Sequence, residues 1–253
     1  MILLKSREEI DLMRRASAIV AEILAEVRAR VRPGATTGEL DALAEELTRK
    51  KGAKPAFKGY TVAGRAFPAS ICISINDEVV HGIPSGKRVL RDGDIVGLDF
   101  GVSYQGYFGD AAMTVPVGKV GSEAEKLMQV TAAALAAGID SIGPGKHVSD
   151  ISGAIQDTAE AAGYSLVREF VGHGIGRSLH EDPQVPNYRT GARGVRLQEG
   201  LVLAIEPMVN AGRPDVYVKE DGWTAATRDG RLSAHFEHSV AVTADGPYIL
   251  SLP

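Results

Sequence analysis

A charged residue interrupts the most apolar strand that the sequence predicts. Asp99 lies in the middle of residues 95–101 (IVGLDFG), a run that otherwise suits the interior of a sheet. A carboxylate buried in such a run costs several kcal/mol unless a cation or hydrogen-bond donors compensate it. The chain must therefore fold so that something neutralises Asp99, and this requirement constrains the fold more than any other feature of the sequence.

Asp110 follows Asp99 after a turn predicted at residues 103–106. With the midpoint of the hairpin between Tyr104 and Gln105, the two aspartates become cross-strand partners with Cβ atoms about 4.5–5.5 Å apart. Two carboxylates at that distance repel each other, and one or two divalent cations would remove the repulsion. A solvent-facing pair on an exposed hairpin is the alternative that the spacing alone leaves open.

Three further side chains with metal-binding atoms lie in comparable surroundings. Glu206 ends the apolar run 201–205 and precedes a proline. Glu237 enters the apolar strand predicted over 236–242, and His173 lies between glycines that let a backbone approach a site closely. Taken singly, each has an ordinary reading as a solvated strand end or a loop residue. Five such residues in one chain, three of them in strands that are otherwise apolar, favour a common site.

The types of these five side chains narrow the choice of metal. Four carboxylates and one imidazole suit Mn, Fe(II) or Co, fit Zn less well, and lack the thiolates of a structural zinc site. Bridging carboxylates can hold two ions, and a two-metal site lowers the pKa of a shared water and polarises a carbonyl, which is the chemistry of amide or ester hydrolysis. Two histidines outside this set, His81 and His180, can orient a substrate or stabilise its oxyanion.

The spacing of apolar residues predicts four helices in two similar pairs. Capping boxes are expected for the first, with Ser6 and Glu9, and for the third, with Ser122 and Glu125. The four helices are predicted from Ser6 to Pro33-Gly34, from Thr36 or Thr37 to about Gly52, from Ser122 to about Ala137, and from Ser149 to about Ala162.

Short apolar runs separated by Gly, Asn and Asp predict strands at residues 71–75, 94–102, 106–117, 201–206 and 236–242. The helices also carry a faint repeat, because aligning Pro33 with Pro144 superposes Gly52 on Gly163. We therefore expect one domain, residues 1–253, built from two halves, about 1–118 and 119–253. Their strands would form one sheet system covered by four helices, with the site where the halves meet.

Composition excludes several other classes of protein. The 28 Lys and Arg against 32 Asp and Glu give a formal charge of -4, so no positive field attracts nucleic acid or an anionic membrane. The single cysteine, Cys72, can form no intramolecular disulfide, which fits a reducing compartment. No run approaches the roughly 18–20 apolar residues of a membrane span. We expect a soluble, cytoplasmic protein.

Four longer segments occur in a specific order together with the two aspartates. They are residues 76–84 (NDEVVHGIP), 172–183 (GHGIGR followed by HEDP), 205–209 (IEPMV) and 236–238 (FEH). This arrangement, which extends from the first predicted helix to the last predicted strand, resembles the type I methionine aminopeptidases of metallopeptidase family M24. The resemblance implies the α+β pita-bread (creatinase/aminopeptidase) fold, with pseudo-twofold-related halves, a curved antiparallel sheet and four main helices. It also implies removal of the initiator methionine from nascent proteins when the second residue is small.

The resemblance further implies two divalent metal ions, Co, Mn or Fe(II), with Zn as a further candidate. Their ligands would be Asp99, Asp110, His173, Glu206 and Glu237, of which Asp110 and Glu237 would bridge the ions.

The same resemblance implies catalytic and binding roles. Glu206 would also shuttle a proton between the attacking water and the leaving amine. His180 would polarise the scissile carbonyl, and His81 would lie near the leaving nitrogen. The substrate pocket would be lined by these two histidines with Tyr60, Phe67, Cys72 and Trp223, whereas Phe57 and Leu179 differ from the residue types expected in some relatives.

Relatives of the same fold provide the main alternatives. Prolidase and aminopeptidase P share the five-ligand pattern but carry a sizeable N-terminal domain, whereas the first helix here is predicted within the first ten residues. Glu206 and Glu237 are 31 positions apart, which leaves no room for the long insertion of type II enzymes. Creatinase-like relatives lack the metal ligands. An inactive binding module is a further alternative, against which the complete ligand set counts.

The expected partners follow from the same resemblance. They are the N-termini of nascent polypeptides that carry the initiator methionine and, at the level of the family, the ribosome through transient contact. Nucleic acid is not expected as a substrate, a membrane is not expected as a partner, and the chain is expected to be a monomer.

Overall fold

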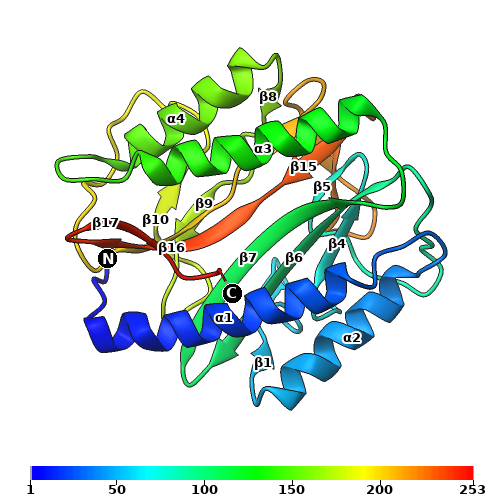
Figure 1. The fold of residues 1–253 in the computed structure, drawn as a ribbon, viewed down its shortest axis with the longest axis horizontal. Coiled ribbons are helices and arrows are strands. Elements are labelled where there is room, and N and C mark those ends of the chain that lie inside the picture. The colour runs from blue at the N-terminus through cyan, green and yellow to red at the C-terminus, as the bar shows by residue number, and fades with distance from the viewer. Residues whose placement is uncertain (1, 253) are drawn as a thin grey trace.

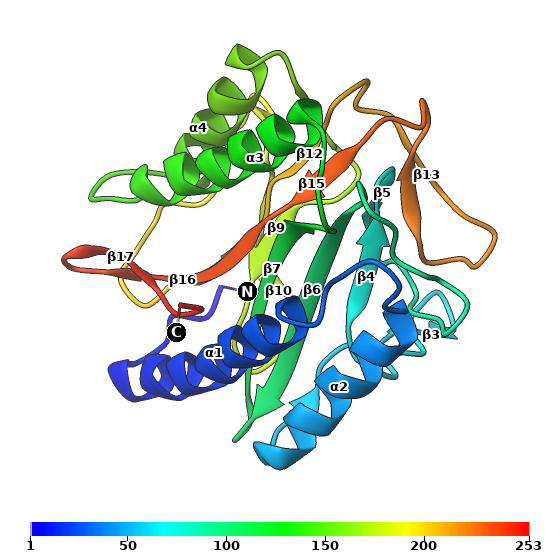
Figure 2. The ribbon, with the colours of Figure 1, turned by 45° about the vertical axis from the view of Figure 1, so that its right-hand side comes forward.

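Four helices cover a curved antiparallel sheet (Figure 1). The computed structural model describes residues 2–252. Helices α1 and α2 lie along one part of the sheet and α3 and α4 along another, as a second view also shows (Figure 2). None of the helices in the described part of the chain is long and apolar enough to cross a membrane. The bounds are Arg7–Arg28 for α1, Thr37–Lys50 for α2, Ser122–Asp140 for α3 and Val148–Ala161 for α4.

The ends of two helices differ from the prediction. The capping box of Ser6 and Glu9 is present at the start of α1, but the helix ends at Arg28, and Val31 lies beyond it. The N–H groups of Arg30 and Val31 donate to the carbonyls three residues earlier, those of Val27 and Arg28, and tighten this end ahead of the proline at position 33. The predicted cap of α3 is wrong, because Gly121 is the N-cap and Ser122 is already helical. The extended backbone of Gly121 places its carbonyl to accept the Glu125 N–H at 3.1 Å.

Helices α2 and α4 occupy equivalent positions in the chain. Each has 14 residues, and both bounds of α4 lie 111 positions after those of α2, the same offset that separates Pro33 from Pro144. The residue before each helix, Thr36 or His147, forms an isolated antiparallel β-bridge. These matches support an internal repeat. The division of the domain into halves near residue 118 stays a prediction.

The central sheet runs in the order β1, β6, β7, β16, β11, β9, β10, with β4 beside β6 and β17 beside β16. Its strands are β1 Lys54–Pro55, β4 Cys72–Ile75, β6 Ile95–Tyr104, β7 Tyr107–Pro116, β9 Gly172–Gly174, β10 Glu181–Val185, β11 Val202–Ile205, β16 Glu237–Thr243 and β17 Gly246–Ile249. Smaller sheets contain β5 Glu78–Val80, β8 Ser165–Leu166, β12 Met208–Asn210, β13 Val216–Val218, β14 Ala225–Thr227 and β15 Ser233–His235, and β2 Thr61–Val62 pairs with β3 Arg65–Ala66.

The two faces of the central sheet have different surroundings. Leu98 and Phe100 of β6 are fully buried in a cluster with apolar residues of α1 and α2. Leu203 and Ile205 of β11 are buried in a second cluster with residues of α3 and α4. Because successive side chains of a strand point to opposite faces, Asp99 lies on the face away from the helices. The helices therefore leave one face of the sheet free to form a site.

The β6–β7 hairpin turns one residue later than predicted. Its turn residues, Gln105 and Gly106, both have positive φ, 51° and 83°, as the two-residue hairpin turn that matches strand twist requires. Asp99 is consequently paired with Ala112, and Asp110 with Gly101, so the expectation that the two aspartates are direct partners is wrong. A shift of two positions keeps both carboxylates on one face as diagonal neighbours.

This turn allows a test of the register. Gly106→Ala forces a side chain into the left-handed region and should lower the free energy of unfolding by about 1–2 kcal/mol. Gln105→Asn should raise it by a few tenths of a kcal/mol, because asparagine tolerates that region better. Urea denaturation measures both variants. Equal stability of Gly106→Ala and the wild-type protein would contradict a turn in which Gly106 has positive φ.

Candidate active site

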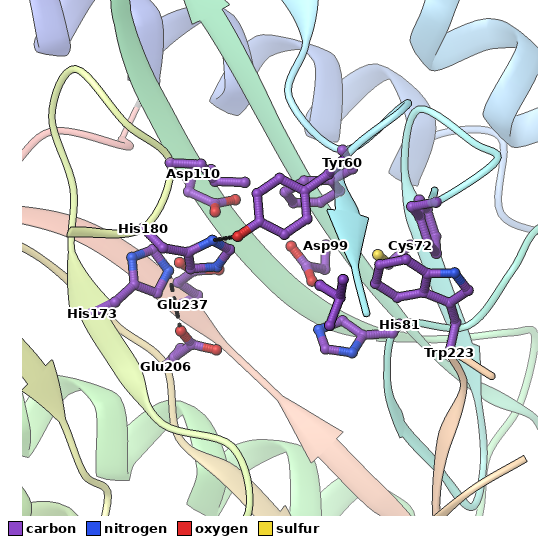
Figure 3. A pocket seen from close by; sticks show the side chains of 14 residues that line it. Tyr60, Cys72, His81, Asp99, Asp110, His173, His180, Glu206, Trp223 and Glu237 are labelled. Carbon is purple, nitrogen blue, oxygen red and sulfur yellow. Dashed lines mark hydrogen bonds and ion pairs between the residues drawn. The ribbon is translucent and has the colours of Figure 1, made fainter. Parts of the chain in front are cut away.

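Five neighbouring strands each bring one predicted metal ligand to the same face of the sheet (Figure 3). Asp99 is on β6, Asp110 on β7, Glu237 on β16, His173 on β9, and Glu206 follows the last residue of β11. The β7–β16 ladder pairs Ala112 with Glu237 and Ala111 with His238, and thereby places the ligands of β6 and β7 beside those of the other three strands. Adjacent strands lie about 4.8 Å apart, a spacing that suits side chains sharing one or two ions.

The geometry fits a divalent cation. Asp110, His173 and Glu237 each offer a ligand atom, and these atoms lie within 4.8 Å of one another. Asp110 Oδ1 and Glu237 Oε1 are buried and have no hydrogen-bond partner among residues 2–252. Buried carboxylate oxygens without donors are energetically costly, and a bound cation would compensate them. The residue types also match the oxygen-rich set that hard divalent ions prefer.

His173 is held in the form that a metal ligand requires. Its Nδ1 lies 2.9 Å from the carbonyl oxygen of Gly174, so an Nδ1–H donor leaves the lone pair on Nε2. That Nε2 lies 3.5 Å from Glu206 Oε1. Burial, with a smaller contribution from His180, lowers the pKa of His173 to about 3. The imidazole is therefore neutral at physiological pH.

Burial raises the pKa of all four carboxylic acids. The pKa of Asp99 rises to about 7 and that of Glu206 to about 8. The pKa values of Asp110 and Glu237 lie well above the ordinary range, because burial is reinforced by the other carboxylates of the cluster. Without a metal ion the site thus retains protons that exposed carboxylic acids would release.

The two predicted catalytic histidines lie on opposite sides of the carboxylates (Figure 3). His180 immediately precedes β10, and its Nδ1 lies 2.8 Å from the hydroxyl of Tyr60. His81 follows β5 with a φ of 61°, a conformation that residues other than glycine seldom adopt and that is often found at functional sites. Burial lowers the pKa of both rings, that of His81 to about 4. Both are neutral near pH 7 and can donate an N–H.

A cavity of about 270 Å³ is lined by the carboxylates and by a group of apolar and aromatic side chains. Phe67 and Trp223 meet edge to face in its wall, with ring centroids 5.3 Å apart. Cys72 is paired with Asp99 across β4 and β6, and burial raises the pKa of its thiol well above the usual value. The structure places every predicted ligand, catalytic and pocket residue around this cavity. Their individual roles stay predictions. The lining is completed by Phe57, Val62 and Leu179.

Two residues of the site were not predicted from the sequence, Val62 in the cavity lining and His235 beside the carboxylates. His235, at the end of β15, is 3% exposed, and its Nε2 lies 3.6 Å from Glu206 Oε2. This nitrogen has no hydrogen-bond partner within the described residues. The sequence does contain one indication that His235 faces the site. It lies two residues before Glu237, and alternate residues of an extended chain point to the same face.

The proton content of the site predicts how stability depends on pH. Below about pH 4 the folded and unfolded chains both hold the carboxylic protons. Burial lowers the pKa of the histidines of the site, so above about pH 7 they are neutral in both the folded and the unfolded chain. Between about pH 7 and 8 the unfolded chain has released its carboxylic protons while Glu206 in the metal-free folded chain retains one, so the free energy of unfolding should fall as pH rises over this interval. Added Mn²⁺ should replace these protons, so its stabilising effect should grow with pH.

Urea denaturation of chelator-treated and Mn²⁺-loaded protein at pH 7 and pH 8 measures both effects. A metal-free protein that becomes more stable over this range would contradict the prediction.

Comparison with known proteins identifies the family. The chain matches the model of metallopeptidase family M24 over residues 11–244. It is 52% identical over 252 residues to a methionine aminopeptidase of Clostridium perfringens, covering 100% of this chain and 99% of that protein. The crystal structure of a methionine aminopeptidase from Thermotoga maritima superposes with a TM-score of 0.96, at 46% identity and full coverage of both chains.

A prolidase from Pyrococcus horikoshii shares the fold, with a TM-score of 0.78 at 24% identity over 99% of this chain and 64% of that one. The pita-bread fold expected from the sequence is thus confirmed. The high identity extends over the whole length of the bacterial relatives. The chain belongs to metallopeptidase family M24 and, within it, to the methionine aminopeptidases.

Proposed function

We propose that this protein removes the initiator methionine from nascent proteins whose second residue is small. The observation that carries the proposal is a single cavity in which the five metal-ligand side chains lie opposite an apolar and aromatic wall. Its volume of about 270 Å³, which includes the space around the ligand side chains, lies near the lower limit of about 300 Å³ for ligand pockets and suits a small group such as one amino-acid residue. Aromatic rings and the Cys72 thiol in its wall suit a polarizable thioether. The full-length relatives named methionine aminopeptidase support the same substrate.

We assign the metal ligands as Asp99, Asp110, His173, Glu206 and Glu237, with Asp110 and Glu237 between two ions of Co, Mn, Fe(II) or Zn. When bound, such ions activate water as a nucleophile and polarise a carbonyl. The neighbouring unpartnered oxygens of Asp110 and Glu237 support their assignment as bridging ligands.

The remaining roles fall to side chains around the carboxylates. Glu206, as a carboxylate in the metal-bound site, would accept a proton from the attacking water and pass it to the leaving amine. With the Tyr60 hydroxyl donating to Nδ1, the neutral ring of His180 carries its proton on Nε2 and can donate it to the scissile carbonyl oxygen. His81 would lie near the leaving nitrogen.

The working environment inferred from this activity is the cytoplasm, where nascent chains emerge from ribosomes. Transient contact with the ribosome and a monomeric state stay predictions. The second residue of the substrate would be restricted to small side chains such as Gly, Ala and Ser.

The test of this proposal is release of free methionine from Met-Gly-Met-Met. Chelator-treated protein is titrated with Mn²⁺, Co²⁺ or Fe²⁺, and Ala-Pro-Ala serves as the control peptide. Metal-dependent methionine release with an intact control peptide supports the proposal. Cleavage of the control alone would instead favour the specificity of aminopeptidase P, and turnover of neither peptide would favour a binding module.

Asp110→Asn should reduce turnover to less than a tenth of the wild-type value, because it removes a bridging charge while preserving shape. A tenfold loss corresponds to about 1.4 kcal/mol of transition-state stabilisation. Circular dichroism should show an unchanged fold, and Asp11→Asn, at an exposed position of α1, is the control. Retention of more than a tenth of the activity would refute the bridging role.

Tyr60→Phe should lower kcat by about tenfold or more with a smaller change in KM, because the ring stays in the pocket wall while the hydroxyl that orients His180 is lost. Steady-state kinetics separates the two effects. A rise in KM at constant kcat would instead assign Tyr60 to substrate binding alone.

A further inference from the structure

A buried ion pair connects the start of the chain to the loop that carries His180. Lys5 Nζ lies 2.6 Å from Glu181 Oε2, and the two side chains are 5% and 11% exposed. The ammonium also donates to the Leu3 carbonyl at 2.9 Å. The backbone N–H of Lys5 donates to the carbonyl of Gly200, which precedes β11, at 2.7 Å. Both the backbone and the side chain of Lys5 are therefore fixed relative to the central sheet.

The other carboxylate oxygen of Glu181 closes this loop. Glu181 Oε1 accepts the N–H of Arg177 at 2.8 Å and the N–H of Ser178 at 3.1 Å. The intervening residues 179 and 180 both line the cavity beside the metal ligands. One carboxylate thus ties the two ends of loop 177–181 together, and Lys5 compensates its negative charge.

Close packing at Gly176 shows that this arrangement is specific. A Cβ built at this position would lie 2.5 Å from Cε of Lys5 and 2.7 Å from Oε1 of Glu181. The Gly176 carbonyl accepts the N–H of Phe108 on β7 at 2.9 Å. Lys5 and Glu181 therefore occupy space that only a glycine leaves free, directly against the strand that carries Asp110.

Stability alone explains such a pair poorly. Burying two charges is costly, and apolar residues of similar volume often serve stability as well or better. A fixed ion pair does supply defined geometry, since the ammonium determines where the carboxylate lies and the carboxylate determines where the loop N–H groups lie. This geometry fixes the position of His180, because His180 is adjacent to Glu181 in the chain.

We propose that Lys5 is a positioning residue for His180, acting through Glu181 to hold loop 177–181 in the shape that presents the imidazole to the scissile carbonyl. This inference rests on the proposed function. Removal of the ammonium leaves a buried carboxylate without a cation, and the carboxylate then turns toward water and takes the loop N–H groups with it. A displacement of about 1 Å at a catalytic group can reduce turnover on the order of a hundredfold.

The test compares Lys5→Met with the double variant Lys5→Met/Glu181→Gln. Lys5→Met should lower kcat by about tenfold or more, with a smaller change in KM and unchanged metal content. The double variant should recover most of the lost kcat, because it has no unpaired charge and the amide oxygen of the introduced glutamine can still accept the loop N–H groups. Lys219→Met is the control for removing a lysine from a largely buried glutamate that keeps a second cation, because Lys219 pairs with Glu78 at 2.8 Å and Arg88 pairs with the same carboxylate.

NMR gives a readout that does not depend on activity. In Lys5→Met, the ring ¹⁵N signals of His180 should shift, whereas those of His147, at the N-cap of α4, should stay in place.

The outcomes separate the two proposals. Wild-type protein that releases no methionine overturns the proposed function, and this inference with it. Active wild-type protein with normal kcat and unshifted His180 signals in Lys5→Met overturns the positioning role alone. An equal loss of kcat in Lys219→Met, or a double variant as impaired as Lys5→Met, also overturns the positioning role.

Discussion

Compensation of buried negative charge is the constraint on which the rest of this structure depends. Four carboxylates converge on one face of the sheet, and burial raises the pKa of each. A protein core offers two ways to keep such a cluster, protonation or a cation. Protonation leaves hydrolytic chemistry without its nucleophile, whereas divalent ions neutralise the charge and activate water in the same place.

The sheet meets this constraint through strand order rather than through long loops. β6, β7, β16, β11 and β9 are consecutive in the sheet although they are distant in the chain. All four helices pack on one face, so the opposite face is available for polar chemistry. The β2–β3 hairpin supplies Val62 to the pocket wall, and β5 of a small sheet leads into His81.

The five proposed ligands can be singled out in the sequence because each departs from its surroundings. Asp99 and Glu237 stand out in apolar strands, where a period of two also predicts which face they share. The register of the β6–β7 hairpin was missed because it depends on which two residues of a four-residue segment accept positive φ. The cap of α3 was missed because a glycine at the N-cap costs only a few tenths of a kcal/mol relative to a serine.

Long-range pairs were beyond prediction for a different reason. Lys5 and Glu181 are 176 positions apart and, taken singly, resemble ordinary surface charges. His235 was not predicted as a site residue because a histidine in a strand more often has a purely structural role. Sequence pattern reveals residues that violate their local surroundings, whereas residues that act through a distant partner become visible only in three dimensions.

The β7–β16 ladder is short, so a metal bound beside it would help to hold the two parts of the sheet together. Two residue pairs, Ala112 with Glu237 and Ala111 with His238, join the strands that carry Asp99 and Asp110 to those that carry the other three ligands. The hydroxyl of Ser239 adds two hydrogen bonds to this ladder, because it accepts the Asp110 N–H and donates to the Asp110 carbonyl. Divalent ions held as we propose, by side chains from both sides of the β7–β16 ladder, would act as a cross-link across it. Occupancy of the site would then govern how readily the sheet opens along this ladder, and slow hydrogen exchange at its backbone amides would measure metal loading.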